Sequence, residues 1–169
     1  MSLNFKFNKS FDLSMVEMFL PSVKYNPGRF NAAIIRIEKF GCTASLFSSG
    51  SVTLCGAKSK KLAKKSRRYL MKKLSAIHDE LSCSPIIVRN IVTVFQTVIL
   101  DIDFTYEKLR SNSLINYIYL EKERYPGIVV KNNKRCAMLF KTGKVIITGF
   151  TKKKKSLRFY NSILQIINE

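Results

Sequence analysis

Short runs rich in β-branched and aromatic residues recur along this chain, and turn-forming residues separate them. Runs of this kind, bounded by Asn-Pro-Gly, Ser-Ser-Gly or Lys-Thr-Gly, predict β-strands joined by tight turns. Two parts of the chain, residues 25–58 and 123–149, carry the same order of strand, turn, strand, turn and strand. A repeated order predicts that the fold contains one structural unit twice.

The two copies match position by position. The offset between them is 95 residues at the first matched pair and 93 at the other two, so the second copy is two residues shorter between its first two strands. The turn glycines Gly50 and Gly143 suit the positive φ of tight hairpins. The matched residues are Phe30 with Tyr125, Phe47 with Phe140, and Gly56 with Gly149.

The strand predicted at residues 30–37 is apolar on both faces. One face carries Phe30, Ala32 and Ile34, and the other carries Ala33, Ile35 and Ile37. An antiparallel sheet with one face in water alternates apolar and polar residues, so this strand needs cover on both sides. Helices can cover one face, and the other face needs a binding partner or a second sheet.

Helical spacing and capping residues predict four helices, of which the first begins at Asp12 or Ser10. A linker at 82–85 separates two halves, 1–82 and 86–169, and the second half opens with a β-rich segment at 86–103. Each half reads strand, helix, three or more strands and helix, which predicts an α+β fold with helices on one face of an antiparallel sheet. The predicted helices cover residues 12–20, 59–81, 106–121 and 151–168, and the other strands cover 3–7, 128–131, 136–140 and 145–148.

The charge of the chain indicates its class of partner. Lys and Arg total 30 against 11 Asp and Glu, a formal net charge of +19, which favours polyanions: nucleic acid first and an anionic membrane second. The sequence holds no apolar run of membrane-spanning length and no signal-peptide pattern, so we expect a soluble intracellular protein. The cysteines lack C-x-x-C spacing, and we expect reduced thiols, no metal and no cofactor. The lone His78 is expected at the surface or at a helix end.

The sequence also bears on two other classes of function. The pair Asp101-x-Asp103 on a predicted strand could hold Mg²⁺, but the sequence offers no further acid cluster, no His partner and no Gly-rich phosphate loop, so we do not expect an enzyme. A basic RNA-binding or architectural module is the alternative, because sheets with exposed aromatic residues also stack bases. Two matched aromatic pairs favour a pseudo-twofold duplex, whereas an RNA-binding sheet needs one aromatic cluster.

Each repeat contains distinctive motifs. In the first they are Tyr25-Asn-Pro-Gly-Arg-Phe30, Leu46-Phe-Ser-Ser-Gly50 and Gly56-Ala-Lys-Ser59. In the second they are Arg89-Asn-Ile-Val92, Glu121-x-Glu-x-Tyr-Pro-Gly127 and Leu139-Phe-x-x-Gly-Lys-Val-x-Ile-Thr-Gly149. With these motifs, nearly the whole chain resembles the core domain of the TATA-box-binding protein family. The resemblance implies a pseudo-twofold saddle of two repeats, a curved antiparallel sheet with helices on the convex face and DNA under the concave face.

The resemblance, rather than the residues themselves, supplies a mechanism. Members of this family bend AT-rich, TATA-type promoter DNA by wedging aromatic rings into the minor groove, and they nucleate the transcription pre-initiation complex in the nucleus or the equivalent DNA-containing compartment. By position, the wedges are Phe30 with Phe47 and Tyr125 with Phe140. Other groove and phosphate contacts fall on Asn90, Thr148, Arg29, Arg36, Lys131, Thr53, Cys55 and Ile146.

The family's positions are filled unequally in the two repeats. The second keeps Asn90 and Thr148, whereas the first has Cys55, and its asparagine either falls before Met1 in a gapless alignment or is replaced by Asn4 after a slip. We therefore expect the second repeat to be the better reader of DNA. Implied partners besides RNA polymerase machinery are a transcription factor IIB-like protein at Glu121 and Glu123 and a IIA-like protein at Lys61, Lys64, Lys65 and Arg68.

Overall fold

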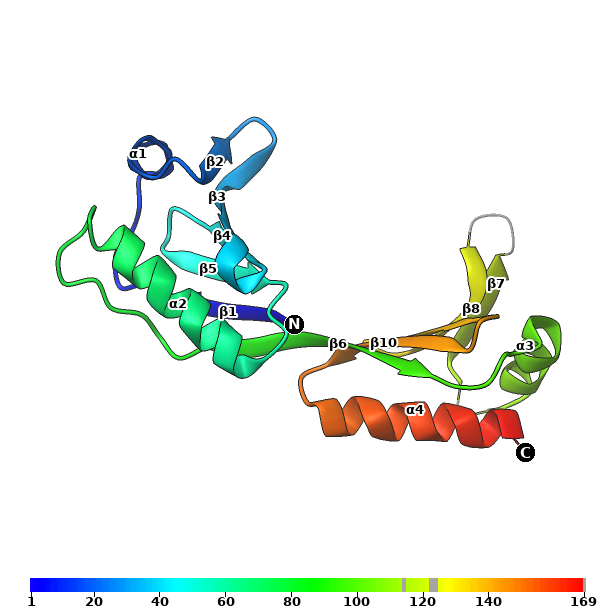
Figure 1. The fold of residues 1–169 in the computed structure, drawn as a ribbon. Coiled ribbons are helices and arrows are strands. Elements are labelled where there is room, and N and C mark those ends of the chain that lie inside the picture. The colour runs from blue at the N-terminus through cyan, green and yellow to red at the C-terminus, as the bar shows by residue number, and fades with distance from the viewer. Residues whose placement is uncertain (114, 122–124, 169) are drawn as a thin grey trace. The chain divides into compact units, whose positions relative to one another are not determined.

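A computed structural model describes residues 1–113, 115–121 and 125–168, with the backbone alone described at Glu121 and Tyr125. The chain forms two compact units, Met1–Arg89 and Asn90–Glu169 (Figure 1). The units divide inside one strand, whereas the repeats predicted from the sequence end at residue 82 and begin again at residue 86. In each unit the helices pack against an antiparallel sheet.

The first unit has five strands in the order β2-β3-β4-β5-β1, so the strand nearest the N-terminus comes last in this order and pairs with β5. Its first helix begins where the sequence predicts, because Asp12 accepts hydrogen bonds from the backbone N–H groups of Ser14 at 2.9 Å and Met15 at 3.3 Å. The elements are β1 (Ser2–Lys6), α1 (Leu13–Phe19), β2 (Val23–Asn26), β3 (Phe30–Ile37), a 3₁₀ turn (Glu38–Phe40), β4 (Cys42–Leu46), β5 (Ser51–Cys55) and α2 (Lys60–Leu74).

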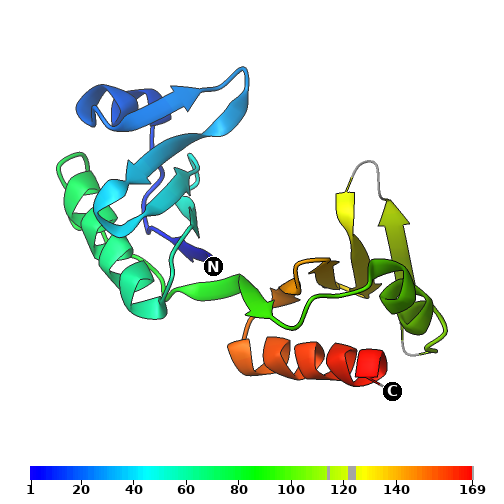
Figure 2. The same cartoon turned by 45° about the vertical axis from the view of Figure 1, so that its right-hand side comes forward.

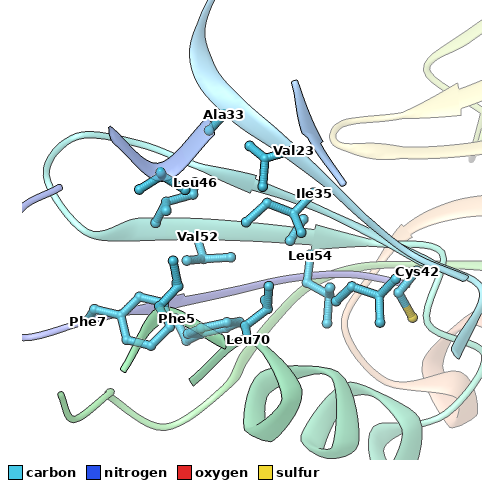
Figure 3. Packing of buried hydrophobic residues seen from close by; sticks show 14 of the residues in the cluster. Phe5, Phe7, Val23, Ala33, Ile35, Cys42, Leu46, Val52, Leu54 and Leu70 are labelled. Carbon is cyan, nitrogen blue, oxygen red and sulfur yellow. The ribbon is translucent and has the colours of Figure 1, made fainter. Parts of the chain in front are cut away.

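Alternate side chains of these strands form the core of the first unit. Figure 3 shows Leu70 of α2 beneath Val52 and Leu54 of β5 and beside Phe5 of β1. Burying each such side chain stabilises the fold by about 1.5–3 kcal/mol. Phe7 extends the core, and the half-buried His78 packs edge-on against Phe11 at a ring-centroid distance of 5.0 Å, so it is a packed residue near the end of α2.

The second unit repeats this plan. Its strand order, counted from the strand nearest the N-terminus, is β6-β10-β9-β8-β7. The long helix α4 runs along the sheet, and Figure 2 shows it from a second angle. The elements are β6 (Ile87–Gln96), α3 (Ile102–Arg110), β7 (Tyr117–Glu121), β8 (Tyr125–Asn132), β9 (Arg135–Phe140), β10 (Lys144–Phe150) and α4 (Lys153–Asn168).

An aromatic contact fixes α4 against its sheet. The ring of Tyr160 stacks on that of Phe95 with centroids 4.3 Å apart and planes 9° apart. The Tyr160 hydroxyl donates a hydrogen bond to the carbonyl oxygen of Gln96 at 3.3 Å. The buried tyrosine therefore satisfies its polar end while its ring fills the core. Ile163 of α4 and Leu109 of α3 are buried in the same core.

The structure confirms the α+β class and corrects two predictions. The segment 106–121, predicted as a helix, contains the end of α3 at Arg110 and the strand β7 from Tyr117. Tyr-Ile-Tyr-Leu alternates as a half-buried strand does, and cross-strand pairing with β8 outweighs its helical spacing. The pair at Asp101 and Asp103 does not lie on a strand, because Asp101 caps α3 and accepts from the Asp103 and Phe104 N–H groups, each at 3.1 Å.

The two turn glycines have the positive φ that the sequence predicts, +79° at Gly50 and +78° at Gly143. Each packs against the loop that follows the first strand of its unit. A Cβ atom at Gly50 would overlap the carbonyl oxygen of Lys9, and one at Gly143 would overlap those of Thr97 and Val98. Both the backbone conformation and the close approach require glycine there.

We predict that Gly143→Ala lowers the free energy of unfolding by about 1–3 kcal/mol from the left-handed backbone alone, with the overlap adding to it. Gly28→Ala is the matched control, because Gly28 has no positive φ and the nearest atom to an added Cβ is 3.6 Å away. Its effect should stay within about 0.5 kcal/mol. Urea unfolding of the two variants measures both, and equal losses would contradict the prediction.

Candidate nucleic-acid interface

The side chains of each sheet that point away from the helices form what we call the outward face of that unit. In the first unit the core side is set by residues such as Leu3, Ala33, Leu46 and Leu54, so their neighbours along each strand point outward. The outward residues are Ser2, Asn4 and Lys6 on β1; Phe30, Ala32, Ile34 and Arg36 on β3; Thr43 and Ser45 on β4, with Phe47 after it; and Ser51, Thr53 and Cys55 on β5.

Phe30 and Phe47 form an aromatic pair on this outward face. Their ring centroids are 6.0 Å apart with an interplanar angle of 70°, an edge-to-face contact. Phe30 is 49% exposed at the first residue of β3, and Phe47 directly follows β4. The structure therefore brings together the two aromatic residues that the first repeat was expected to use as wedges, and it leaves much of the Phe30 ring in solvent.

A surface groove of about 660 Å³ runs beside Phe30. Three cationic side chains, Lys24, Arg29 and Arg36, line it, and all three are exposed. Glu17 is the one acidic residue in its lining. A groove with this charge suits a ligand that carries several negative charges.

In the second unit, Phe140 ends β9 and lies opposite Gly127 of β8 in the strand register. Tyr125 begins β8 three residues before Ile128, and its backbone pairs with Glu121 of β7. The strand ends that carry the second predicted wedge pair thus lie close together, although the Tyr125 side chain is not among those described. The predicted partner residue Glu123 lies outside the described residues.

Asn90 and Thr148 meet on the outward face of the second unit. The Asn90 Nδ2 atom donates to Thr148 Oγ1 at 2.8 Å, and the Gly149 N–H donates to Asn90 Oδ1 at 2.9 Å. The Asn90 Nδ2 atom carries two hydrogens and the bond to Thr148 uses one of them, so the second stays available as a donor. Because Thr148 Oγ1 accepts from Asn90, its own hydroxyl hydrogen is also free to donate. The pair therefore offers two positioned donors.

The first unit lacks this pair. Cys55 is exposed at the position matching Thr148, and its thiol reaches Ser2 Oγ at 3.9 Å. Asn4 lies opposite Thr53 in the strand register, two residues away from Cys55. In the second unit the residue equivalent to Asn4 is Val94, which lies opposite Ile146, and not Asn90. The alternative in which Asn4 replaces the missing asparagine after a slip is therefore wrong.

The predicted phosphate contacts are at the surface. Arg29 and Arg36 are exposed, and Lys131 is exposed on β8 with its Nζ atom 5.8 Å from the Tyr117 ring centroid and 5.4 Å from that of Tyr119. Two electron-rich rings hold this ammonium in place without neutralising it. The residues predicted to meet a IIA-like partner, Lys61, Lys64, Lys65 and Arg68, are all exposed on α2.

Cross-strand register adds residues that sequence reasoning did not single out. In the first unit the row through Thr53 runs Asn4–Thr53–Ser45–Ile34, and in the second the row through Ile146 runs Val94–Ile146–Met138–Val129. We call these the first and second central rows. Ser45 and Met138 could have been found, because each lies two residues before a predicted wedge and so shares its face.

The described residues form neither a membrane-spanning helix nor a cluster of metal ligands. None of the described helices has the length and apolar character that a membrane crossing requires. In the same residues, His, Cys, Asp and Glu side chains form no group of three or more that could hold a metal ion. The four cysteines are free thiols.

Comparison with known proteins gives one consistent result. The family model described as "Transcription factor TFIID (or TATA-binding protein, TBP)" matches residues 1–77 and 86–169. The TATA-box-binding protein of Thermoplasma volcanium is 30% identical over 141 residues, 82% of this chain and 75% of the relative. That of Methanocaldococcus jannaschii is 29% identical over 167 residues, 97% of this chain and 88% of the relative. The solved structure of Methanococcus jannaschii TBP, 24% identical, matches with a TM-score of 0.83 over 99% of this chain and 94% of that chain, so the two share a fold.

The thiols provide a test of the two sheet faces. Cys55 is exposed, whereas Cys42 faces the core and is 4% exposed. Burial raises the pKa of the Cys136 thiol, and the nearby Lys131 ammonium lowers that pKa in part. Since the thiolate is the reactive form, we predict that a pulse of iodoacetamide labels Cys55 first and Cys42 last. Because its pKa is raised, the labelling rate of Cys136 should continue to rise at pH values where the labelling rate of an ordinary thiol has already levelled off. Mass spectrometry gives the order, and equal rates at Cys42 and Cys55 would contradict the assignment of faces.

Proposed function

Because the chain belongs to the TATA-binding protein family, we propose that it binds AT-rich, TATA-type promoter DNA through the minor groove and bends it by aromatic wedging. The family consists of DNA-binding transcription factors and not of enzymes. The observation that carries the proposal is the Phe30–Phe47 pair, two aromatic rings in contact on the outward face. An aromatic pair that served only packing would lie on the core side.

The outward face of the second unit supports the same reading. Val92 and Val94 are 53% and 58% exposed on β6, beside the half-buried Ile146 of β10. An apolar surface of this kind fits a minor groove that has been opened and flattened. At its edge, Asn90 and Thr148 present the donors that the A N3 and T O2 acceptors of A·T pairs require.

Positive charge supplies the rest of the affinity in this proposal. Arg29, Arg36 and Lys131 lie at the outward faces and are exposed, where they would contact phosphates and release counterions. The excess of 30 Lys and Arg over 11 Asp and Glu draws the chain toward any polyanion. Charge therefore gives attraction to DNA, and the outward faces give the choice of duplex and groove.

We assign the implied partners to this function as well. On bent promoter DNA, the chain would nucleate a transcription pre-initiation complex with RNA polymerase machinery. A IIB-like factor would meet Glu121 and Glu123, and a IIA-like factor would meet the exposed cations Lys61, Lys64, Lys65 and Arg68 of α2. Such a protein works in the compartment that holds the DNA, which is the nucleus where the cell has one.

We predict that Phe30→Ala and Phe47→Ala each reduce DNA bending much more than they reduce stability. A wedge in solvent loses little when it is truncated, whereas truncating a core phenylalanine costs about 3–5 kcal/mol. Phe5→Ala is the matched control, since Phe5 is 3% exposed on β1. Bending is read by fluorescence transfer between duplex ends and stability by thermal unfolding.

The result that would overturn the wedge assignment is a large fall in melting temperature for Phe30→Ala with bending intact. The same assay tests the alternative function. A basic RNA-binding or architectural module without TATA specificity would bind single-stranded RNA or GC-rich duplex as tightly as the AT-rich duplex. The proposed function requires the AT-rich duplex to bind best.

We also predict that affinity falls with salt and yet remains measurable at high salt. Each phosphate contact contributes about −0.9 to the slope of log affinity against log salt, so Arg36→Gln should flatten the slope by about that amount. Lys72→Gln is the control, because Lys72 is exposed on α2. Anisotropy titrations over a salt series measure the slopes. Extrapolation to almost no binding at 1 M salt would show that the apolar outward face contributes nothing.

A further inference from the structure

The two central rows are chemically different although they occupy equivalent positions. In the first unit three of the four residues, Asn4, Thr53 and Ser45, carry a polar group, and Ile34 is the exception. The second row, made of Val94, Ile146, Met138 and Val129, is entirely apolar. The repeat offset of 93 pairs Thr53 with Ile146 and Ser45 with Met138.

The polar groups of the first row are available to a ligand. Asn4, Ser45 and Thr53 are half-buried, and their side chains make no hydrogen bond within the described part of the chain. Each hydroxyl can donate one hydrogen bond and accept others, and the Asn4 amide offers both an acceptor and donors. The row can therefore satisfy a donor or an acceptor that approaches it.

Minor-groove chemistry turns this difference into a difference in base-pair choice. A·T pairs present only the acceptors A N3 and T O2, and a G·C pair adds one donor, the guanine 2-amino group. Against an apolar row that amino group loses its water and gains no partner, which is unfavourable. Against a row of hydroxyl and amide groups it finds an acceptor. The donor is the one feature that separates the pairs in this groove.

We propose that the first repeat accepts G·C pairs beneath Asn4, Thr53 and Ser45, whereas the second repeat requires pairs without a minor-groove amino group beneath Ile146 and Met138. The preferred ligand is then a composite duplex, with one half restricted to A·T and one half of mixed sequence. This inference rests on the proposed minor-groove function and specifies its substrate.

The experiment adds one chemical group at a time. Replacing adenine by 2,6-diaminopurine in an A·T site places a 2-amino group in the minor groove and keeps the pairing with thymine. Three duplexes carry the group in neither half, in one half or in both halves of a symmetric A·T site. Because the chain can bind in either direction, it places the modified half under whichever repeat tolerates it, and no orientation probe is needed.

With unequal repeats, the duplex modified in one half binds within about twofold of the parent, and the duplex modified in both halves loses about tenfold or more, the usual cost of a wrong pair. If the two repeats are equal, the fold-loss of affinity for the duplex modified in one half is the square root of the fold-loss for the duplex modified in both halves. That pattern would overturn the inference. In a duplex with a G·C-bearing half, replacing guanine by inosine removes the same amino group, so it should abolish any loss of affinity that the G·C pairs cause.

Paired variants assign the effect to the rows. Thr53→Val with Ser45→Ala removes two acceptors while keeping shape, so the one-half duplex should now lose about tenfold relative to the unmodified duplex with the same variant. Ile146→Thr with Met138→Ser is the reciprocal pair of substitutions. This variant should lose about as little affinity for the duplex modified in both halves as the wild type loses for the duplex modified in one half. Thermal unfolding checks that each variant is folded.

The failures of the inference and of the proposed function are distinguishable. If the unmodified A·T duplex is bent and binds best, but the 2-amino groups cost the same affinity under both repeats and the row variants do not change that cost, the inference alone is wrong. If that duplex is neither bent nor preferred over single-stranded nucleic acid, the proposed function falls and the inference falls with it.

Discussion

Each strand of this protein has two faces, and the helices of its unit cover one of them. Leu54 and Leu70 meet on the covered face of the first unit, and Phe95 and Tyr160 meet on that of the second. These contacts hold the sheet against its helices and thereby fix which residues point the other way. The position of every candidate interface residue, from Phe30 to Thr148, follows from this single division of faces.

The same division explains how far sequence reasoning can reach. Alternation and turn glycines locate β3, β4, β5, β9 and β10, and the Asp12 cap locates α1. The short strand β2 (Val23–Asn26) was not predicted, because one buried residue gives no pattern and its pairing with β3 makes it a strand. For the strand β7 the sequence predicts a helix, because the pairing with β8 that makes this segment a strand cannot be seen in its own residues.

The candidate site shows a similar limit. The candidate wedges could be named because the two repeats place an aromatic residue at matching positions in the sequence, and the structure brings two of them, Phe30 and Phe47, into contact. The bond from Asn90 to Thr148 joins residues 58 apart in sequence, and the place of Asn4 beside Thr53 depends on the register between β1 and β5. A single sequence carries strand patterns but not cross-strand register, so these neighbours emerge only from the fold.

The unequal central rows have a consequence for direction. A protein made of two identical repeats would bind in two opposite orientations with equal populations, even on a site whose two halves differ in sequence. A difference of about 1.4 kcal/mol between the two orientations makes one of them roughly ten times more populated. The first repeat has three polar side chains at positions where the second repeat has apolar ones. On a site with one A·T half and one half of mixed sequence, that difference would favour one orientation. Divergence between the repeats would then give the complex a polarity, and a polymerase assembled on it would have an upstream and a downstream side.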